Sequence, residues 1–558
     1  MKKTILLFFA VWAMTQLSQA TTYYVSTSVG VDTNNGLSWT TPFKTIGKAI
    51  TTANAAGSGD IWVQAGTYVG GYSPSIPNVN FYGGFFGNET ALSQRTLTDA
   101  DGNGIVEPWE FANETILSYT NTLTTNAGPL FYIVGTNITS ADKLIIDGFT
   151  MSYTNVTNSN NATSALNLAS NAVITFQNNI IRNCSVNITS NGGFAVLMSA
   201  RGIVKNCLFE RNSATIAFAS TVNNVSVPLI NLNANTKMTG CIVRNNSLTV
   251  DYTGNTNGSS NFKGLMLQIT GGTNGTPAQY TTVSNCLVHN NEATYLPTTG
   301  RFSGASMVGF GTFSSSATTD SLLNCVIANN KGTRLISGAT GIAMAYAVTT
   351  NTAYHYVLNN VLWNNIDETA AVKNLVIPNT QGAGSISNNV MNGGMSYSTS
   401  LATVANNLTD LSTTNLGTNP PAFKNPTILM GITTDLTTEK SDWRILTNSY
   451  LIGKGIATTR LTDKAGNLFA SSPAVGAYET VSTLTTGVNI PEMTANAVLV
   501  TRNGFVSNVQ GSVQVLNFLG KTLKSENVKV GQEMALPAGG YILRIATNNG
   551  ILVQKIVL

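Results

Sequence analysis

The chain has 558 residues, of which only 10% are charged, and its formal net charge at pH 7 is +4. So sparse a charge excludes the concentrated basic surface with which proteins bind nucleic acids or anionic membranes. The 42% of apolar residues exclude an intrinsically disordered chain, and the abundant Gly, Asn, Thr and Ser are typical of a β-protein with many turns.

The start of the chain predicts a signal peptide over residues 1–20. Residues 1–3 (Met-Lys-Lys) are basic, residues 5–14 are apolar, and residues 18–20 (Ser-Gln-Ala) have the small-x-small pattern of a cleavage site. The apolar run is too short to span a bilayer, and no later run reaches the roughly 18 apolar residues that a membrane helix needs. We therefore expect a secreted mature chain without a transmembrane segment, either extracellular or attached to the outer-membrane surface.

Residues 45–53 carry apolar side chains at helical spacing, at Ile46, Ala49, Ile50 and Ala53. This spacing predicts a short helix. We expect the helix to close one end of a β-solenoid, where strand edges and apolar core would otherwise be exposed.

A dense group of carboxylates predicts a calcium loop in an insertion at about 95–112. Residues 99–110 fit the twelve-residue template, with ligands from Asp99, Asp101, Asn103, the Ile105 carbonyl oxygen, Glu107 and Glu110. Without a cation these carboxylates would repel one another. No flanking helices are evident, so we expect Ca²⁺ to be a structural ion here; a solvated acidic turn is the alternative.

A repeated unit runs through the middle of the chain. Its clearest copies, each built from apolar pairs, a cysteine or asparagine, and a final asparagine, are residues 204–212, 238–246, 283–291, 322–330 and 357–365. Another short apolar strand precedes each copy, and the period is roughly 35 to 45 residues. The pattern predicts coils of short β-strands stacked about 4.8 Å apart, with equivalent residues above one another.

Two sets of equivalent residues should form rows inside this stack. The first row is Cys207, Cys241, Cys286 and Cys325, and the second is Asn212, Asn246, Asn291, Asn330 and Asn365. Stacked asparagines can pass side-chain amide hydrogen bonds from coil to coil. We expect the cysteines to be small buried hydrophobic residues rather than disulfide partners.

Three strand-length runs of alternating polarity end the chain, at residues 513–520, 536–545 and 551–558. They predict a separate small β-domain after a Thr/Ser-rich joint. The expected organisation is a signal peptide (1–20), a β-helix (21–480), a linker (481–487) and a C-terminal domain (488–558).

The repeats over about residues 140–410 resemble those of the pectate-lyase-like right-handed parallel β-helix superfamily, and residues 23–68 and 442–479 resemble the opening and closing segments of such proteins. The runs "NFLGK", "LPAGGYILRI" and "QKIVL" resemble the type A sorting domain of the type IX secretion system of Bacteroidota. The resemblance implies an all-β chain: a right-handed parallel β-helix followed by a small immunoglobulin-like sandwich. It also implies the type IX secretion machinery as a partner of the C-terminal domain.

Catalytic groups are scarce in the sequence. No acidic pair recurs at equivalent positions of the repeats, and the chain has only two histidines, His289 and His355. We expect His289 to be a solvated surface residue. The candidates for a uronide-handling catalytic cluster, from loops of neighbouring coils, are Arg301, Lys331, Arg334 and Asp320.

These observations favour a non-catalytic secreted or cell-surface protein that is adhesin-like or binds a glycan or another host or surface polymer. The alternative is a polysaccharide lyase, or another carbohydrate-active enzyme, acting on an acidic polysaccharide. A base clustered with carboxylates and calcium on one face of the helix would favour the lyase. A flat, neutral face coated with Asn and Thr would favour binding.

Overall fold

The computed structural model describes most of the chain in segments. The described residues are 20–74, 78–119, 130–133, 143–154, 156–158, 166–168, 173–188, 197–217, 228–252, 260–262, 265–269, 280–297, 302–310, 319–334, 346–349, 354–367, 374–377, 385–393, 395–397, 403–409, 420–433, 441–458, 462–479, 498–501, 504–507, 510–516, 522–537, 540–547 and 550–557. The chain divides into two compact units, Met1–Thr480 and Val481–Leu558. Within the described segments, no helix is both long enough and apolar enough to cross a membrane.

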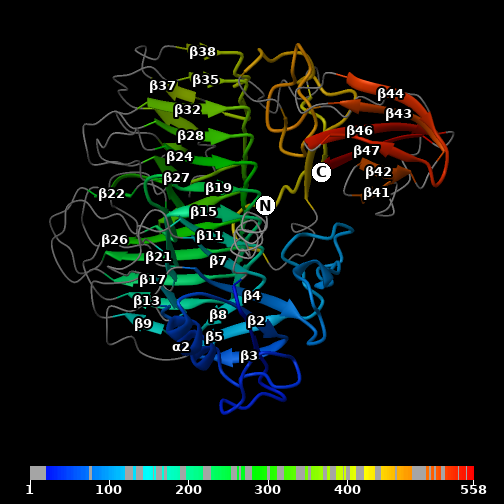
Figure 1. The fold of residues 1–558 in the computed structure, drawn as a ribbon. Coiled ribbons are helices and arrows are strands. Elements are labelled where there is room, and N and C mark those ends of the chain that lie inside the picture. Colours follow the sequence, from blue (N-terminus) through cyan, green and yellow to red (C-terminus); the bar gives the residue numbers. More distant parts are fainter. Residues whose placement is uncertain are drawn as a thin grey trace, which may run out of the picture. The chain divides into compact units, whose positions relative to one another are not determined.

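The first unit is a parallel β-helix in which four sheets run along the stack (Figure 1). The twelve strands of sheet A are β1 (Thr22–Val25), β2 (Gly59–Gln64), β4 (Val79–Phe85), β7 (Lys143–Asp147), β11 (Val173–Gln177), β15 (Gly202–Lys205), β19 (Lys237–Thr239), β24 (Tyr280–Ser284), β28 (Thr319–Leu323), β32 (Tyr354–Leu358), β35 (Ser385–Ser387) and β38 (Thr403–Ala405). The ten strands of sheet B are β3 (Gly66–Val69), β5 (Thr115–Tyr119), β8 (Thr150–Tyr153), β12 (Ile180–Arg182), β16 (Leu208–Glu210), β20 (Ile242–Arg244), β25 (Leu287–His289), β29 (Val326–Ala328), β33 (Val361–Trp363) and β36 (Val390–Met391).

Two further sheets complete the central coils. The six strands of sheet C are β9 (Val156–Asn158), β13 (Ser185–Ile188), β17 (Ser213–Ala217), β21 (Ser247–Tyr252), β26 (Glu292–Pro297) and β30 (Lys331–Arg334). Sheet D holds β6 (Phe131–Tyr132), β10 (Leu166–Leu168), β14 (Met198–Ala200), β18 (Ile230–Leu232), β23 (Leu267–Ile269), β27 (Phe302–Phe310), β31 (Tyr346–Thr349), β34 (Leu375–Ile377) and β37 (Met395–Tyr397), with β22 (Ser260–Phe262) beside β27. One coil therefore follows the sheets in the order D, A, B, C.

The short turns between sheets explain the repeated asparagines of the sequence. The first residue of each turn has a positive φ, between 50 and 58° for the asparagines at the A–B turns (Asn178, Asn206, Asn285, Asn324, Asn359, Asn388 and Asn406) and at the B–C turns (Asn183, Asn245, Asn290, Asn329 and Asn364). Asparagine tolerates this left-handed conformation better than other residues with a side chain.

The predicted row of inward asparagines is confirmed. Asn246 Nδ2 donates to Asn291 Oδ1, and Asn291 Nδ2 donates to Asn330 Oδ1, each at 2.9 Å, so the amides form a continuous ladder through the buried B–C corner. The expected state of the cysteines is confirmed as well: Cys207, Cys241, Cys286 and Cys325 are buried free thiols.

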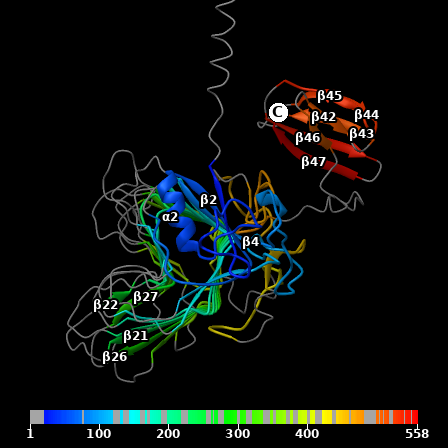
Figure 2. The same cartoon turned by 60° about the horizontal axis from the view of Figure 1, so that its bottom comes forward.

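The ends of the stack differ in how they are closed. Helix α2 (Ile46–Ala56) begins after the cap residue Thr45, ends at Gly57 in the left-handed conformation, and buries the four apolar side chains that predicted it. These side chains join the core of the β-helix, so α2 covers its first coils (Figure 2), as predicted. A short 3₁₀ helix, η1 (Leu92–Gln94), leads into the acidic loop, and β39 (Phe423–Asn425) pairs with β40 (Asp442–Ile445) near the end of the unit.

The second unit has two antiparallel sheets with a shared core. One sheet contains β41 (Val498–Thr501), β42 (Gly504–Ser507) and β45 (Glu533–Ala535), and the other contains β44 (Thr522–Val528), β43 (Gly511–Leu516), β46 (Gly540–Thr547) and β47 (Gly550–Val557). Phe505 and Met534 from the first sheet are buried together with Val515 and Leu543 from the second. The predicted fold class, a parallel β-helix followed by a small β-sandwich, is confirmed.

Candidate functional site

The acidic loop brings three of its predicted ligands together. One carboxylate oxygen each of Asp99, Asp101 and Glu110 lies within 4.8 Å of the others. The backbone forms the tight turn of the template, with Gly104 at a φ of 84°. Backbone amides of the loop donate to the carboxylates: the Asn103 N–H reaches Oδ1 of both aspartates at 3.0 Å. The loop therefore has the shape that an oxygen-liganded cation requires.

The other predicted ligands border this group. The Asn103 side chain donates to Glu107 Oε1 at 2.9 Å, and the Ile105 backbone N–H donates to Asn103 Oδ1 at 2.7 Å. The second oxygen of Glu107, Oε2, is buried without a hydrogen-bond partner. Burial, followed by the neighbouring Glu110 carboxylate, raises the pKa of Glu107 to about 8. A buried carboxylate oxygen without a partner fits a divalent cation, because the cation would stabilise its charge.

The acidic loop docks on the outer face of sheet B. Trp109 packs against Ile180 and Leu208, which are the outward-facing residues of β12 and β16. Next to this apolar contact, Asp101 Oδ2 lies 3.5 Å from Arg244 Nη2. Trp109 and the Asp101–Arg244 ion pair therefore attach the loop to sheet B.

Arg244 belongs to a buried polar network on the same face. Its Nε and Nη2 atoms each lie 2.9 Å from Glu210 Oε2 on the preceding coil, and both side chains are 4% exposed. Arg211, at the rim, lies 2.9 Å from the other Glu210 oxygen. Glu210 and Arg244 occupy equivalent positions of successive repeats. Opposite charges one coil apart were the signal that would have predicted this pair.

His289 continues the row of Glu210 and Arg244, and the expectation that it is solvated is wrong. Its side chain is 1% exposed. Burial, with the nearby charges of Arg244 and Lys464, lowers its pKa to about 3 and so keeps the imidazole neutral. Asn290 uses its Nδ2 to donate to carbonyl oxygens of residues 429 and 431, so its Oδ1 accepts the 2.8 Å bond from His289 Nδ1. The histidine is therefore locked in one tautomer beneath a segment more than a hundred residues away.

That segment, residues 420–479 without the gaps given above, is here termed the closing segment. It follows the two rows of left-handed asparagines and accepts their side-chain amides. Nδ2 atoms donate to its backbone carbonyls at Asn290–Leu429 (2.6 Å), Asn329–Thr427 (2.9 Å), Asn324–Thr462 (2.8 Å), Asn388–Ile456 (2.7 Å) and Asn406–Lys454 (2.8 Å). Between these two tracks, Phe423, Trp443 and Leu451 cover outward-facing apolar residues of sheet B.

The predicted catalytic candidates are dispersed. Lys331 lies on sheet C, where its Nζ atom is 3.7 Å from Glu292 of the neighbouring strand. Arg334 ends the same strand, in register with Tyr295, and its side chain lies outside the described part, as does Arg301 altogether. Asp320 lies on sheet A, in register with His355, and is 1% exposed. Among these four residues, the described ones do not form a shared site.

The stability of the β-helix should depend on pH through the buried carboxyl group of Asp320. Burial raises its pKa to about 7, and the Thr281 N–H that donates to it at 3.3 Å only partly offsets this effect. Because the folded state holds the proton to higher pH than the unfolded state, the stability that this proton contributes is complete below about pH 4 and is lost as the pH rises to about 7. We expect urea midpoints to fall between pH 5 and 8, and Asp320→Asn to flatten this fall. An identical fall in the variant would assign the pH dependence to another group.

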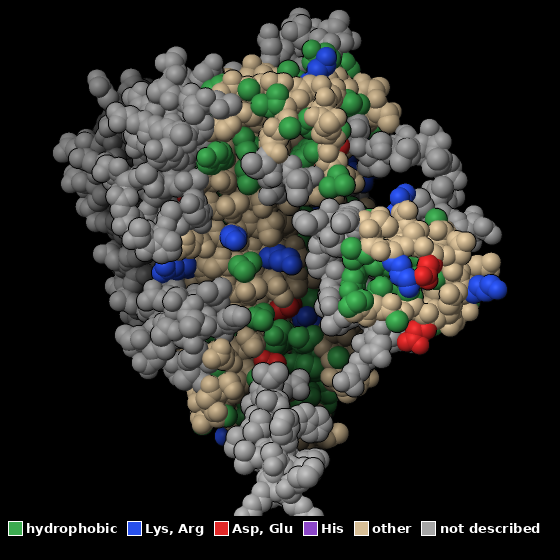
Figure 3. All heavy atoms as spheres, turned by 45° about the horizontal axis from the view of Figure 1, so that its top comes forward, with side chains coloured by type: hydrophobic (Ala, Val, Ile, Leu, Met, Phe, Trp, Pro, Cys, Tyr) green, Lys and Arg blue, Asp and Glu red, His purple; other side chains and the backbone are tan. Residues whose placement is uncertain are grey.

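The outer face of sheet A has a different character from that of sheet B. Two rows of side chains in register point outward: Ile203, Lys237, Thr282, Ser321, Tyr356 and Ser385, and Lys205, Thr239, Ser284, Leu323, Leu358 and Ser387. Leu358 and Ser387, at the end of the second row, are buried. Lys205, Lys237 and Tyr356 are exposed, and these rows contain no acidic residue. Figure 3 shows isolated Lys and Arg side chains on a largely neutral part of the solenoid surface, with a few acidic side chains and a group of hydrophobic ones below them.

Comparison with known proteins adds a likeness in fold. No protein-family model matches the chain, and no curated protein matches it. Among solved structures, the chain is similar to the crystal structure of pectate lyase Pel9A, with 14% sequence identity, over 83% of this chain and 97% of that chain, at a TM-score of 0.38.

Proposed function

We propose that this protein is an exported, non-catalytic scaffold that binds a glycan on the outer face of sheet A. One observation carries the proposal. On sheet B, the base His289 and the ion pair of Arg244 with Glu210 are buried, with these three residues between 1 and 3% exposed. A polysaccharide cannot reach these groups, so they serve structure.

Sheet A supports the binding role. Its strands stack about 4.8 Å apart, so its hydroxyl groups and exposed lysines form periodic rows along the solenoid axis. Tyr356, 37% exposed, offers a ring on which a sugar can stack. An extended glycan lying along the axis would contact these hydroxyl groups, the lysines and the tyrosine ring in succession.

The binding test uses the mature chain and immobilised neutral and acidic polysaccharides. We expect retention on at least one polymer, and expect Lys237→Gln/Tyr356→Ala to weaken it. The matched control is Lys44→Gln/Phe86→Ala, which removes one exposed lysine and one exposed ring near the N-terminus. Equal retention of both double variants would place the ligand elsewhere. Release of unsaturated sugar products, seen by ultraviolet absorbance, would instead make the protein a lyase.

We further propose that the acidic loop binds Ca²⁺ as a structural clamp. Asp99, Asp101 and Glu110 would hold the ion, and the buried Oε2 of Glu107 supports its presence. Asp101 also reaches Arg244, so an ion that orders the loop would strengthen its docking on sheet B. The C-terminal unit is proposed to direct export through the type IX secretion machinery, which its separate compact fold permits.

Calcium should stabilise the protein in a pH-dependent way. At a free Ca²⁺ concentration of 100 times Kd we expect about 2.7 kcal/mol of added stability, abolished in Asp99→Asn. Because the pKa of Glu107 is raised to about 8 without an ion, binding near pH 7 should release a proton, and the affinity should rise with pH up to about 8. Calorimetry in buffers of different ionisation enthalpy measures this proton. Binding without proton release would contradict a role for Glu107 as a ligand.

A further inference from the structure

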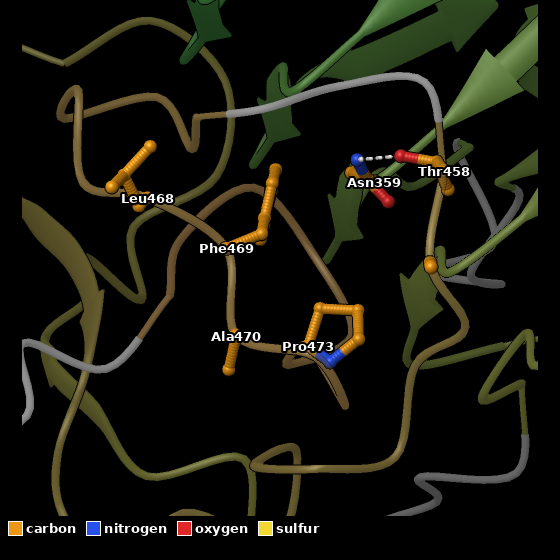
Figure 4. Close-up of a pocket in the computed structure, with 7 residues that line it drawn as sticks. Asn359, Thr458, Leu468, Phe469, Ala470 and Pro473 are labelled. Atoms are coloured by element: carbon orange, nitrogen blue, oxygen red, sulfur yellow. Dashed lines mark hydrogen bonds between the residues drawn. The ribbon is translucent and has the colours of Figure 1, made fainter. Parts of the chain in front are cut away.

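A small pocket lies between the closing segment and the A–B corner of the solenoid. Its volume is about 260 Å³, and its lining residues are Asn359, Ala457, Thr458, Leu468, Phe469, Ala470 and Pro473 (Figure 4). In Figure 4 the Phe469 ring lies between Leu468 and Asn359. The pocket is smaller than the roughly 300–1,000 Å³ typical of drug-sized ligands, so it fits one small ring.

The walls of the pocket are held in place from both sides. Asn359 Nδ2 donates to Asn324 Oδ1 at 3.2 Å and to Thr458 Oγ1 at 3.5 Å. Across the pocket, Glu479 accepts the backbone N–H of Ala470 at 3.3 Å and that of Ala474 at 3.0 Å. The Asn359–Thr458 bond joins the asparagine row to the closing segment, and the Glu479 bonds fix the closing segment internally, so the cavity is formed before a ligand arrives.

The chemistry of the lining selects the class of ligand. None of the seven lining residues is charged, so a carboxylate, phosphate or ammonium group would lose its hydration without gaining a partner. Phe469 and Pro473 form an apolar wall with the exposed Leu468 at its rim, and the Thr458 hydroxyl, which accepts from the buried Asn359 amide, forms a polar edge. This combination suits a ring with one apolar face and hydroxyl groups at its edge.

The pocket also borders the face on which the glycan is proposed to bind. Asn359 directly follows β32, the strand that carries the exposed Tyr356. A sugar unit at the end or on a branch of a glycan lying on sheet A would therefore meet the pocket next to Tyr356.

We infer that this pocket binds a single neutral pyranose unit, with the apolar face of the sugar on Phe469. The inference rests on the proposed glycan-binding function and names a subsite for it. The apolar wall favours a unit with a methyl group at C5, so a 6-deoxyhexose should bind about tenfold more tightly than the same sugar carrying the C6 hydroxyl.

The test is ligand-observed NMR on the mature chain with methyl glycosides in matched pairs, such as D-fucose with D-galactose. We expect binding of the deoxy sugar, weakened about tenfold by Phe469→Ala. Ala470→Leu, which fills the pocket but retains the Phe469 ring, should cause the same loss. If both variants lose binding, misfolding of Phe469→Ala alone cannot explain the result. Phe86→Ala, a distant exposed ring, is the control and should bind normally.

Polymer retention of the same preparations separates the two proposals. Sugar binding that neither pocket variant weakens, or equal binding of a uronic acid, overturns the subsite even if polymer retention persists. Loss of sugar binding in both pocket variants supports the subsite. If the wild-type protein binds the sugar in this way but is not retained on any polysaccharide, only the sheet A proposal is overturned.

Discussion

Replacing Asn291 with alanine is expected to destabilise the β-helix by about 4 kcal/mol, more than any other single change considered for this protein. Asn291 is fully buried and takes part in four side-chain hydrogen bonds. It accepts from the Asn246 N–H (3.0 Å) and Nδ2 (2.9 Å), and donates to Val243 O and Asn330 Oδ1 (both 2.9 Å). Alanine would remove all four bonds and leave polar groups of the neighbouring coils buried without these partners.

Urea unfolding of the variant and of the wild type measures this loss. The matched control is Asn187→Ala, which changes an exposed asparagine on β13 and should alter the free energy of unfolding by less than about 0.5 kcal/mol. Similar small changes in both variants would show that the amide ladder is not a source of stability. A larger loss for Asn291→Ala with an unchanged slope against urea would support the ladder.

Replacing Arg244 with leucine is the second large effect, with an expected loss of about 3 kcal/mol. Glu210 is 4% exposed and would remain buried with only the rim residue Arg211 as its partner. The acidic loop would also lose its ion pair at Asp101. We therefore expect Arg244→Leu to lower the urea midpoint and to make the loop more sensitive to proteolysis, an increase that added Ca²⁺ partly reverses.

A neighbouring ion pair provides the control for this prediction. Arg182 occupies the equivalent position two coils earlier and pairs with Glu114 at 2.6 Å, but both side chains are about a third exposed, at 34% and 36%. Arg182→Leu should therefore cost about 1 kcal/mol or less.

In the double variant Glu210→Leu/Arg244→Leu the uncompensated charge is gone, so most of the stability should return. A double variant as unstable as Arg244→Leu would mean that packing, rather than the buried charge, causes the loss.

The architecture of the β-helix could be predicted from the sequence because its determinants are local and repeated. Each Asn-Asn or Asn-Cys pair specifies a left-handed residue followed by an inward one, and each short apolar run specifies a strand. Equivalent residues of successive repeats must then lie above one another. The ladder of Asn246 and Asn291 and the buried cysteines follow from this periodicity. The capping helix follows instead from the helical spacing of apolar residues over 45–53.

Which segments cover the outer faces of the solenoid is known only from the tertiary structure. The sequence carries no signal that residues 427–433 and 454–464 will lie along the asparagine rows. Those contacts join residues up to 188 positions apart and use backbone groups, which are common to nearly all residues. The burial of His289 and the pocket at Phe469 depend on the closing segment, and the pairing of Asp101 with Arg244 depends on the docking of the acidic loop. Periodic side chains thus determined the coils by themselves, whereas long-range packing determined which of their faces stayed open to a ligand.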